Sequence, residues 1–485
     1  MKILVVSSEA VPFAKTGGMG DVLGALPKAF AKQQHEVKLF LPFYPSVSRS
    51  GYGIEPLKWS LNIDIVDKSY PFNVVVAKEK KLPLEYGFIQ NSHFFGRDGI
   101  YRDNNGHKDY SDNDERFIFF NRAILETLKK INWKPDIIHI HDWQAGLIPT
   151  YLKTLYSKDF FFKGIKTVLT IHNLAYQGTF EKEKFSNLGL PESLFYPASP
   201  FEFYGKVNFL KAAIFYTDKI TTVSEKYAQE IQTEELGCGL DGVLRERGND
   251  IVGILNGVDY NIWSPSRDKK IPYKYYPANL SGKKMNKIEL LGEAGLPIRE
   301  KTPLIGIISR LADQKGFDLI EKVADEIFQL NLQMILLGTG EKKYHQLFSQ
   351  LEQKYPDKLK VYLTFDDELA HKIEAAADIF LMPSQFEPCG LNQMFSLKYG
   401  TIPIVREVGG LADTVKNYNP ETQEGNGFVF KEYSANAMLK TIVRAVNLFS
   451  KRRLWIKIMK AGMIENFSWD KSAEKYLSLF EQLIK

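Results

Sequence analysis

Short apolar runs alternate along the chain with longer segments whose hydrophobic spacing suits helices. In the first half, the runs predict strands at 2–7, 36–41, 136–141, 167–172 and 219–223, with an added hairpin at 72–77 and 84–89. In the second half, they predict strands at 251–255, 304–309, 334–337, 360–363, 379–382 and 402–405. This alternation is typical of α/β proteins with parallel sheets covered by helices on both faces.

The strand pattern begins again near residue 250. A chain of 485 residues is longer than one hydrophobic core usually serves. We therefore predict two Rossmann-like, doubly wound domains, 1–250 and 251–465, that face each other across a deep cleft. After Phe467-Ser468, an apolar stripe at helical spacing includes Trp469, Tyr476 and Phe480. Because such a stripe needs a packing partner, we predict that 466–485 form a helix crossing back to the first domain.

Composition narrows the class of protein. The 63 basic and 58 acidic residues leave a net charge of +5, which is too small a surplus to favour a nucleic-acid partner. The two cysteines, Cys238 and Cys389, lack the paired spacing of a disulfide framework or a zinc cluster. No signal peptide or long apolar run is visible. We expect a soluble, cytoplasmic protein that does not enter a membrane.

The first strand runs into a glycine-rich loop, Lys15-Thr-Gly-Gly-Met-Gly-Asp21, followed by a predicted helix at 21–33. Glycines let the backbone approach an anion, and a helix N-terminus offers unpaired N–H groups. The loop matches neither the dinucleotide pattern G-x-G-x-x-G nor the Walker loop. It is therefore a candidate phosphate site, with a plain tight turn as the alternative.

Polar residues follow two further strands of the first half. His139, His141 and Asp142 end one strand, and His172-Asn173 ends the next. In open α/β sheets, ligands bind beyond the carboxyl ends of the strands. His139 and His141 share one face and could hold a metal ion, but no third ligand at matching spacing is present. A hydrogen-bonded strand end is favoured over a metal site, and a buried structural histidine stays open for position 172.

The second half carries more specific chemistry. Arg310 and Lys315 follow a strand and could clamp a diphosphate, unless they are solvated surface cations. Glu387 precedes the helix start Cys389-Gly390-Leu391 and could accept hydrogen bonds from sugar hydroxyls. The alternative is that it only caps its own helix. Together with Lys15, these residues indicate a nucleotide-sugar site between the two predicted domains.

These motifs resemble those of bacterial-type glycogen synthases, also called starch synthases, of glycosyltransferase family 5. The matching segments occur in family order over essentially the whole chain. They are Lys15-Thr-Gly-Gly-Met-Gly-Asp-Val22, Asp112-Asn113 with Glu115-Arg116-Phe117, His141-Asp-Trp143, Thr170-Ile-His-Asn-Leu-Ala-Tyr-Gln-Gly178, Leu255-Asn-Gly-Val-Asp259, Ser309-Arg-Leu-Ala-Asp-Gln-Lys-Gly316, Glu387-Pro-Cys-Gly-Leu-Asn-Gln393, Gly409-Gly-Leu-Ala-Asp-Thr414 and Phe467-Ser-Trp469.

The resemblance implies the GT-B fold and a retaining transfer of α-glucose from ADP-glucose to the non-reducing 4-OH of an α-1,4-glucan. It implies that Arg310 and Lys315 neutralise the leaving diphosphate. Lys15 and the backbone at Gly18 would support the phosphates from the other domain. Glu387 would hold the glucose hydroxyls beside the backbone N–H groups of 389–391. The expected partners are thus ADP-glucose and a glucan, with no metal, pyridoxal phosphate or other cofactor.

The resemblance also assigns roles in the first domain. His172 would contact the glucose 6-OH and present its carbonyl near the anomeric carbon, and Asp142 would lie near the acceptor hydroxyl. Asn256 and Tyr101 would line the donor and acceptor surroundings. The remaining implied substrate-binding residues are Asp21, Asn173, Phe365, Cys389, Gly390, Leu391 and Asn392.

The chain departs from the family pattern at a few positions. Phe365 stands where a tyrosine commonly stacks on adenine, so stacking survives without the hydroxyl. Asn392 and Val408 stand where threonine is frequent. Phe395 lies eight residues after Glu387, where related retaining transferases often carry a second glutamate.

Charge development supports the implied chemistry. Breaking the glycosidic bond makes the sugar positive and the nucleotide negative, so fixed cations at the phosphates stabilise the transition state. Double displacement would need a carboxylate nucleophile, and the family offers none, which favours front-face attack assisted by the leaving phosphate. Domain closure would exclude the water that hydrolyses the donor.

Three other functions remain open from the sequence. The first is a related transferase that uses UDP-glucose or a small acceptor. It stays open because the sequence offers no residue that can be assigned to recognising the nucleotide base. The second is a noncatalytic glucan-binding homologue. The third is a phosphorylase-like enzyme, for which Lys398 is the nearest candidate pyridoxal phosphate lysine.

Overall fold

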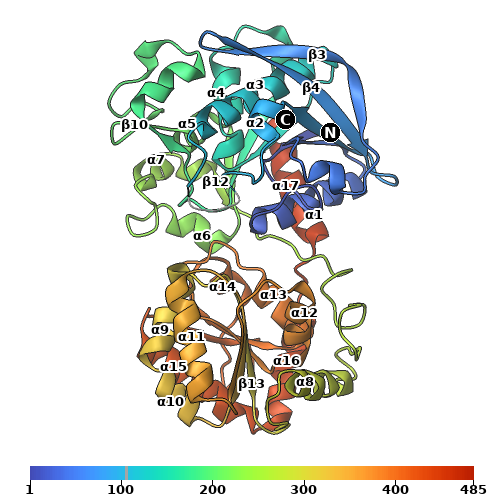
Figure 1. Ribbon diagram of the computed structural model, residues 1–485, viewed down its shortest axis with the longest axis vertical. Coiled ribbons are helices and arrows are strands. Elements are labelled where there is room, and N and C mark those ends of the chain that lie inside the picture. Colours follow the sequence, from blue (N-terminus) through green and yellow to red (C-terminus); the bar gives the residue numbers. More distant parts are fainter. Residues whose placement is uncertain (104–107) are drawn as a thin grey trace. The chain divides into compact units, whose positions relative to one another are not determined.

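The computed structural model describes residues 1–103 and 108–485, which form two compact units. The first unit contains 1–223, 228–257 and 469–485, and the second contains 224–227 and 258–468. Each unit is an α/β structure with helices packed around a sheet (Figure 1). The C-terminal segment therefore belongs to the first unit. The chain enters the second unit briefly at 224–227 and passes between the units again at 257/258 and 468/469.

In the described part of the first unit, nine strands form one sheet in the order β12-β11-β7-β6-β1-β2-β5-β4-β3. All neighbouring strands are parallel except β4, which runs antiparallel to β3 and β5. Their bounds are β1 Lys2–Val6, β2 Glu36–Pro42, β3 Glu55–Ile65, β4 Lys68–Lys78, β5 Leu84–Gln90, β6 Ile137–His141, β7 Lys166–Ile171, β11 Lys219–Thr222 and β12 Ile251–Gly253. A small separate sheet contains β8 Thr179–Phe180, β9 Glu202–Phe203 and β10 Lys206–Asn208.

Two features of this sheet differ from the sequence-based prediction. The strand expected to open the second domain is β12, which pairs in parallel with β11 through Ile220 and Ile251 and completes the first sheet. An apolar run shows that a segment is a strand but not which sheet it joins. The predicted hairpin, β4 and β5, also has a third member, β3, at the sheet edge. Most of β3 is exposed or half-buried. From Leu57 to Ile65 its apolar residues alternate with polar ones instead of forming a continuous run, and the prediction missed this alternation.

The helices of the first unit cover the sheet (Figure 1). α17 lies against α1, where Phe30 packs on Tyr476 and Phe480 with ring centroids 6.1 and 5.7 Å apart. The apolar stripe near the C-terminus thus has its packing partner. The helices are α1 Gly18–Lys32, α2 Ser92–Phe95, α3 Asn113–Lys130, α4 Leu147–Lys153, α5 Phe209–Tyr216, α7 Asp241–Glu246 and α17 Trp469–Ile484, with α6 Glu225–Glu230 shared with the second unit.

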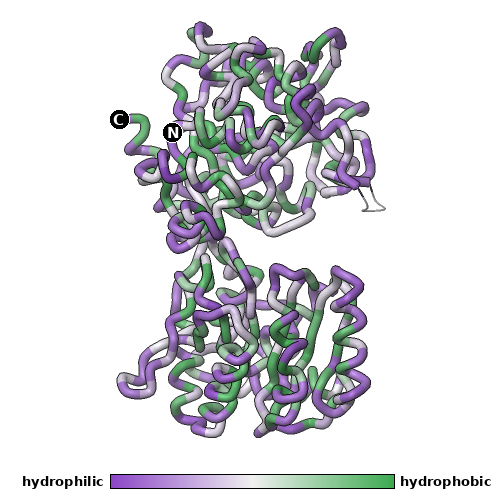
Figure 2. The backbone as a smooth tube through the Cα atoms, turned by 90° about the vertical axis from the view of Figure 1, so that its left-hand side faces the viewer, coloured by the Kyte–Doolittle hydropathy of each residue, from purple (hydrophilic) through white to green (hydrophobic). Residues whose placement is uncertain are grey.

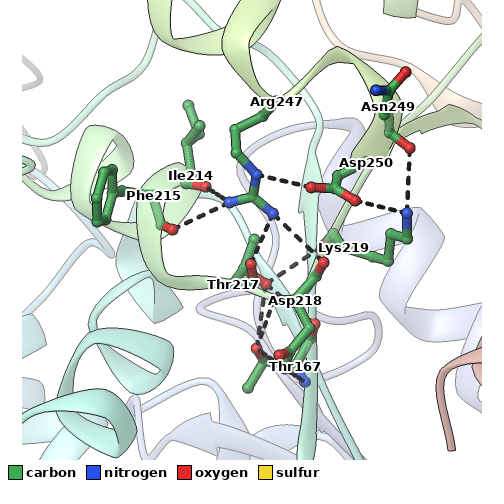
Figure 3. Close-up of polar contacts among 9 residues, drawn as sticks. All are labelled: Thr167, Ile214, Phe215, Thr217, Asp218, Lys219, Arg247, Asn249 and Asp250. Carbon is green, nitrogen blue, oxygen red and sulfur yellow. Dashed lines mark hydrogen bonds and ion pairs between the residues drawn. The ribbon is translucent and has the colours of Figure 1, made fainter.

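Arg247 ties the end of α5 to the strands that follow it (Figure 3). Its guanidinium donates to the backbone carbonyls of Ile214, Phe215 and Thr217 and to the Asp250 carboxylate. The last carbonyls of a helix lack intrahelical partners, so an arginine satisfies them and offsets their partial negative charge. Lys219 at the start of β11 donates to the same Asp250 carboxylate over 2.7 Å, which links β11 to the start of β12.

In the described part of the second unit, six parallel strands form a sheet in the order β15-β14-β13-β16-β17-β18. Figure 2 shows hydrophobic residues concentrated along the inner strands, which are buried on both faces. The strands are β13 Leu304–Ile308, β14 Gln333–Leu337, β15 Leu359–Tyr362, β16 Ile379–Met382, β17 Ile402–Arg406 and β18 Phe428–Phe430. The helices are α8 Ser281–Glu293, α9 Phe317–Lys322, α10 Ala324–Gln329, α11 Lys342–Lys354, α12 Asp367–Ala376, α13 Asn392–Tyr399, α14 Gly409–Thr414, α15 Ala435–Phe449 and α16 Arg452–Met463.

The segment before α8 is fastened to this unit by an aromatic stack. The Trp263 ring lies between His371 and Phe395, with centroids 3.7 and 4.0 Å away and planes tilted by only 12° and 2°. His371 in turn contacts the buried Asp268 carboxylate over 2.7 Å. Phe395, at the position where related transferases carry a second glutamate, therefore serves packing in this chain.

Within the described residues, no helix combines the length and the apolar character needed to cross a membrane.

Candidate active site

Glu9 organises the glycine-rich loop between β1 and α1. Its carboxylate is 3% exposed and accepts hydrogen bonds from the backbone N–H groups of Thr16 and Gly17 over 2.5 and 3.1 Å. It also accepts from the hydroxyls of Thr16 and Tyr101, each over 2.7 Å. Because charge-assisted bonds are stronger than neutral ones, one buried carboxylate fixes both the loop and Tyr101.

The loop presents open backbone and a cation. A Cβ added to Gly17 or Gly18 would meet no atom within 4 Å, which leaves room for a ligand at the start of α1. Lys15 Nζ lies 2.7 Å from the Asp21 carboxylate, and both side chains are about two-fifths exposed, at 43% and 42%. Lys15 also lines a cavity of about 580 Å³ that Tyr44, among others, helps to enclose.

Asp142 and His172 meet where β6 and β7 end. The Asp142 carboxylate accepts the backbone N–H of His172 over 2.7 Å, and the Asp142 residue itself is held at a φ of 54°. A positive φ is uncommon for a residue with a side chain. Burial raises the pKa of Asp142 to about 7, against the opposing effect of the backbone N–H groups of His172 and Asn173. In its ionised form, Asp142 holds the turn that positions the backbone of His172.

Three neutral histidines lie beside this turn. Burial lowers the pKa of His139 and His172 to about 3 and that of His141 well below its usual range. His139 Nε2 contacts the Thr170 hydroxyl over 2.7 Å, and His141 Nδ1 contacts His172 Nε2 over 2.9 Å. Within the described ranges, no group of three or more His, Cys, Asp or Glu is placed to hold a metal ion.

The other predicted residues of the first unit have mixed environments. Burial raises the pKa of the Tyr101 hydroxyl well above its usual range, so it stays protonated and donates to Glu9. The Asn173 side chain accepts the backbone N–H of Ala175 over 3.1 Å and so closes a local turn. Asn256 is 5% exposed, and its side-chain oxygen has no hydrogen-bond partner among the described residues.

In the second unit, Arg310 and Lys315 lie on the loop between β13 and α9. Gly316 follows them with a φ of 74°, and a Cβ added there would lie 2.0 Å from the backbone oxygen of Pro383. Glycine is therefore needed both for the backbone angle and for the close approach to the loop after β16. The Arg310 side chain is exposed and has no hydrogen-bond or ion-pair partner in the part of the chain that the structure describes.

That close approach brings Lys315 and Glu387 together. Lys315 Nζ lies 2.6 Å from the Glu387 carboxylate, which also accepts from the Ser384 hydroxyl over 3.0 Å. The two side chains are 20% and 9% exposed, so the pair is largely shielded from water. The structure thus joins two predicted site residues that are 72 positions apart.

Glycines also shape the loop after Glu387. A Cβ on Gly409 would lie 2.0 Å from the Glu387 backbone oxygen, and one on Gly410 would lie 2.1 Å from that of Cys389. The Gln393 side chain donates to the Cys389 and Gly390 carbonyls over 3.1 and 3.0 Å. These contacts fix the loop 387–391 in front of α13.

The remaining candidate residues in the second unit are Asn392, Phe365 and Lys398, and each has a different environment. The Asn392 side chain donates to the backbone carbonyl of Ile308 over 2.7 Å, which joins α13 to the end of β13. Phe365 is 81% exposed between β15 and α12, an orientation open to stacking. Lys398, the candidate for pyridoxal phosphate, donates to the Met463 carbonyl over 3.3 Å and lies over the Tyr260 ring.

Comparison with known proteins identifies the family. Residues 2–246 match the family described as starch synthase catalytic domain, and residues 293–461 match glycosyl transferases group 1. A glycogen synthase of Pseudothermotoga lettingae is 45% identical over 490 aligned residues, which cover 100% of this chain and 99% of that protein. The chain belongs to the glycogen and starch synthase family. The glycogen synthase of Thermotoga maritima is 44% identical, with 100% and 99% of the two chains covered.

Solved structures of glycosyltransferases agree with this assignment. The catalytic domain of starch synthase IV from Arabidopsis thaliana, bound to ADP and acarbose, superposes with a TM-score of 0.88 at 33% identity and 99% coverage of both chains. Sucrose-phosphate synthase from Thermosynechococcus elongatus, at 17% identity and a TM-score of 0.61 over 99% and 98% of the chains, shares the fold. This member of the glycogen and starch synthase family therefore has the GT-B fold.

Two residues of this family member were not singled out from the sequence, and a third, His141, was considered there only as a possible metal ligand. Glu9 holds the glycine-rich loop, Ser384 contacts Glu387, and His141 contacts His172. Glu9 and Ser384 could have been found, because each lies two residues beyond the end of a predicted strand. His141 ends the predicted strand at 136–141, but no sequence pattern reports its contact with His172.

Proposed function

We propose that this protein transfers α-glucose from ADP-glucose to the non-reducing 4-OH of an α-1,4-glucan, with retention of configuration. The observation that carries the proposal is the pair formed by Lys315 and Glu387 at the ends of neighbouring strands, in a chain that matches glycogen synthases over its whole length. Ligands of open α/β sheets bind at such strand ends.

The second unit is proposed to bind the donor. Arg310, which is exposed and free of partners among the described residues, and Lys315 supply positive charge for the diphosphate. Glu387 accepts hydrogen bonds from the glucose hydroxyls, with the backbone of 389–391 beside it, and the exposed ring of Phe365 stacks on the base. Fixed cations that meet the charge developing on the leaving nucleotide lower the barrier to transfer.

The first unit is proposed to act on the transferred glucose and the acceptor. Lys15 and the backbone at Gly18 support the phosphates. The His172 carbonyl and ring contact the sugar, and Asp142 fixes the turn that carries them. Asp142 is proposed to lie near the acceptor hydroxyl, with Asp21, Tyr101, Asn173 and Asn256 around the substrates.

Front-face attack is the proposed course of the reaction. Glu387 is held by Lys315 and Ser384, so it is placed as a hydrogen-bond acceptor for the sugar and not as a free nucleophile. The acceptor 4-OH then attacks from the side on which ADP leaves, and its proton passes to the departing phosphate. We propose that the reaction needs neither a metal nor pyridoxal phosphate, and that it takes place in the cytoplasm.

The choice of ADP over UDP rests on relatives. The structure of starch synthase IV, at 33% identity, contains ADP and acarbose, which supports an adenine nucleotide for this chain. The experiment is to measure nucleotide release by the purified protein with glycogen as primer and ADP-glucose or UDP-glucose as donor, with and without EDTA. Primer-dependent release from ADP-glucose that is unchanged by EDTA supports the proposed donor, the glucan acceptor and the independence from a divalent metal. Release from UDP-glucose alone contradicts the donor.

A further inference from the structure

His141 and His172 share a single hydrogen bond between their rings. His141 ends β6, His172 follows β7, and the His141 Nδ1 atom lies 2.9 Å from His172 Nε2. His141 is completely buried, while His172 is partly exposed. The ring of His139 lies on the other side of His141, with a centroid distance of 4.2 Å. The partly exposed ring that is proposed to meet the sugar is therefore supported by buried imidazoles behind it.

Each ring of the pair carries one hydrogen. Burial holds the pKa of both imidazoles far below neutrality, so neither is an imidazolium at pH 7. A neutral imidazole has one donor nitrogen and one acceptor nitrogen. One of the two facing nitrogens must therefore donate, and that choice fixes the position of the hydrogen on both rings.

The second nitrogen of His141 decides between the two arrangements. His141 Nε2 is buried and has no hydrogen-bond partner among the described residues. If Nδ1 accepted, the hydrogen of His141 would lie on Nε2 as an unpaired buried donor. Orphaned buried N–H groups are rarer in proteins than unpaired acceptors. The arrangement in which His141 Nδ1–H donates leaves only an unpaired acceptor at Nε2 and is therefore favoured.

The same assignment of donors and acceptors places the ring hydrogen of His139. His139 Nε2 contacts the Thr170 hydroxyl over 2.7 Å, which contacts the Thr221 hydroxyl over 2.6 Å. Thr221 donates to the Leu169 carbonyl over 3.3 Å, so Thr170 donates to Thr221 and accepts from His139 Nε2–H. The orphaned nitrogen of His139, Nδ1, is then also a bare acceptor.

We propose that His141 is a positioning residue that fixes the tautomer of His172. By donating from Nδ1 to His172 Nε2, it places the hydrogen of His172 on Nδ1, where it can donate to a hydroxyl oxygen of the transferred hexose. The choice of a sugar hydroxyl, the 6-OH, rests on the proposed function. The tautomer itself rests on the hydrogen-bond arrangement of two neutral rings and does not depend on the proposed function.

The tautomer can be measured without activity. Long-range ¹H–¹⁵N correlation spectra of the full-length protein labelled with ¹⁵N-histidine distinguish protonated from bare ring nitrogens, and the spectrum of His172→Gln assigns the His172 signals by their loss. We expect His172 to be protonated on Nδ1 and bare on Nε2. A His172 protonated on Nε2 overturns the proposal, whatever the protein turns out to catalyse.

Kinetics then test whether the tautomer matters for the sugar. kcat/KM is measured with ADP-glucose and with ADP-6-deoxyglucose, which lacks the hydroxyl. We expect His141→Leu to lower kcat/KM for ADP-glucose by roughly tenfold to a hundredfold and for the deoxy donor by much less. His141→Asn, whose amide can donate from a similar position, should recover part of the loss.

A matched control separates positioning from packing. His139→Leu removes the adjacent buried imidazole, which has neither a hydrogen bond nor a ring contact with His172 among the described residues, and should leave the ratio of kcat/KM between the two donors as in the wild type. Equal losses on both donors in His141→Leu would show that His141 acts only through packing and would overturn the proposed link to the sugar. If His141→Leu does not fold, the same comparison is made with His141→Asn and the tautomer measurement stands. If the wild type uses neither donor, the proposed function fails while the spectra still decide the tautomer.

Discussion

Replacing Glu387 by glutamine separates the two roles proposed for the second unit, which are binding of the diphosphate and binding of the glucose hydroxyls. Lys315 Nζ donates to the Glu387 carboxylate over 2.6 Å. The lysine that is proposed to meet the diphosphate is thus already engaged with the residue that is proposed to hold the sugar. Glutamine keeps the size and an acceptor oxygen but removes the negative charge. Lys315 then becomes more available to an anion, while the sugar loses a charged acceptor.

The burial of this pair, together with typical hydrogen-bond energies, sets the expected changes in ADP affinity and in kcat. With the two side chains only 20% and 9% exposed, the pair is poorly screened, and a hydrogen bond between charged groups contributes about 1.5–3 kcal/mol. A neutral acceptor keeps part of this, so the variant releases about 1 kcal/mol for ADP binding, or roughly a fivefold tighter Kd. Loss of a charged group that is aimed at the reacting sugar should lower kcat by about a hundredfold.

Calorimetric titration with ADP and steady-state nucleotide release measure the two effects separately. Lys315→Ala is the matched variant, because it removes the other half of the same pair. It should weaken ADP binding and lower kcat by about a hundredfold or more. The two variants should therefore move ADP affinity in opposite directions while both lose turnover.

The reasoning fails if Glu387→Gln weakens ADP binding as much as Lys315→Ala does while turnover stays intact. That result would mean that Glu387 serves the nucleotide and that the pair is not a meeting point of phosphate and sugar.

Three further predictions concern other parts of the chain. Because burial raises the pKa of Asp142 to about 7, protonation below pH 7 should lower kcat/KM, and the pH–rate profile of Asp142→Asn should lack this acidic limb; an unchanged limb would contradict the assignment. Arg247→Ala should lower the free energy of unfolding of the first unit by about 3–5 kcal/mol in urea titrations. The control Arg245→Ala removes a side chain that is 55% exposed and should cost under about 1 kcal/mol. Similar losses in the two variants would refute the role of the Arg247 contacts. Gly316→Ala, whose Cβ would lie 2.0 Å from a backbone oxygen, should weaken ADP binding at least about tenfold, whereas Gly295→Ala, at a similar φ but with no atom within 4 Å, should leave ADP affinity unchanged.

Much of the fold follows from local pattern. The inner strands β1, β13 and β14 are largely apolar runs because both of their faces are buried, and such runs can be read directly from the sequence. The edge strand β3 could not be read in this way, because one of its faces is exposed. The placement of β12 needed knowledge of which strand it pairs with, and no local pattern contains that information.

The candidate site shows the same limit: the positions of its residues could be predicted from the sequence, but their contacts could not. The positions of Lys15, Asp142, His172 and Glu387 could be predicted, because each follows a strand or begins a helix and such ends collect ligands in α/β proteins. The contacts that define them could not. The pairing of Lys315 with Glu387 depends on loops brought together at a glycine, and no spacing within either segment reports the distance between them.

The central claim is tested most directly by nucleotide release from purified protein with a glycogen primer and ADP-glucose or UDP-glucose in parallel. The account predicts primer-dependent release of ADP, with the primer lengthened by α-1,4-linked glucose that is sensitive to digestion by α-amylase. Release from UDP-glucose alone would contradict the proposed donor. Release from neither nucleotide sugar would contradict the proposed glucosyltransferase itself.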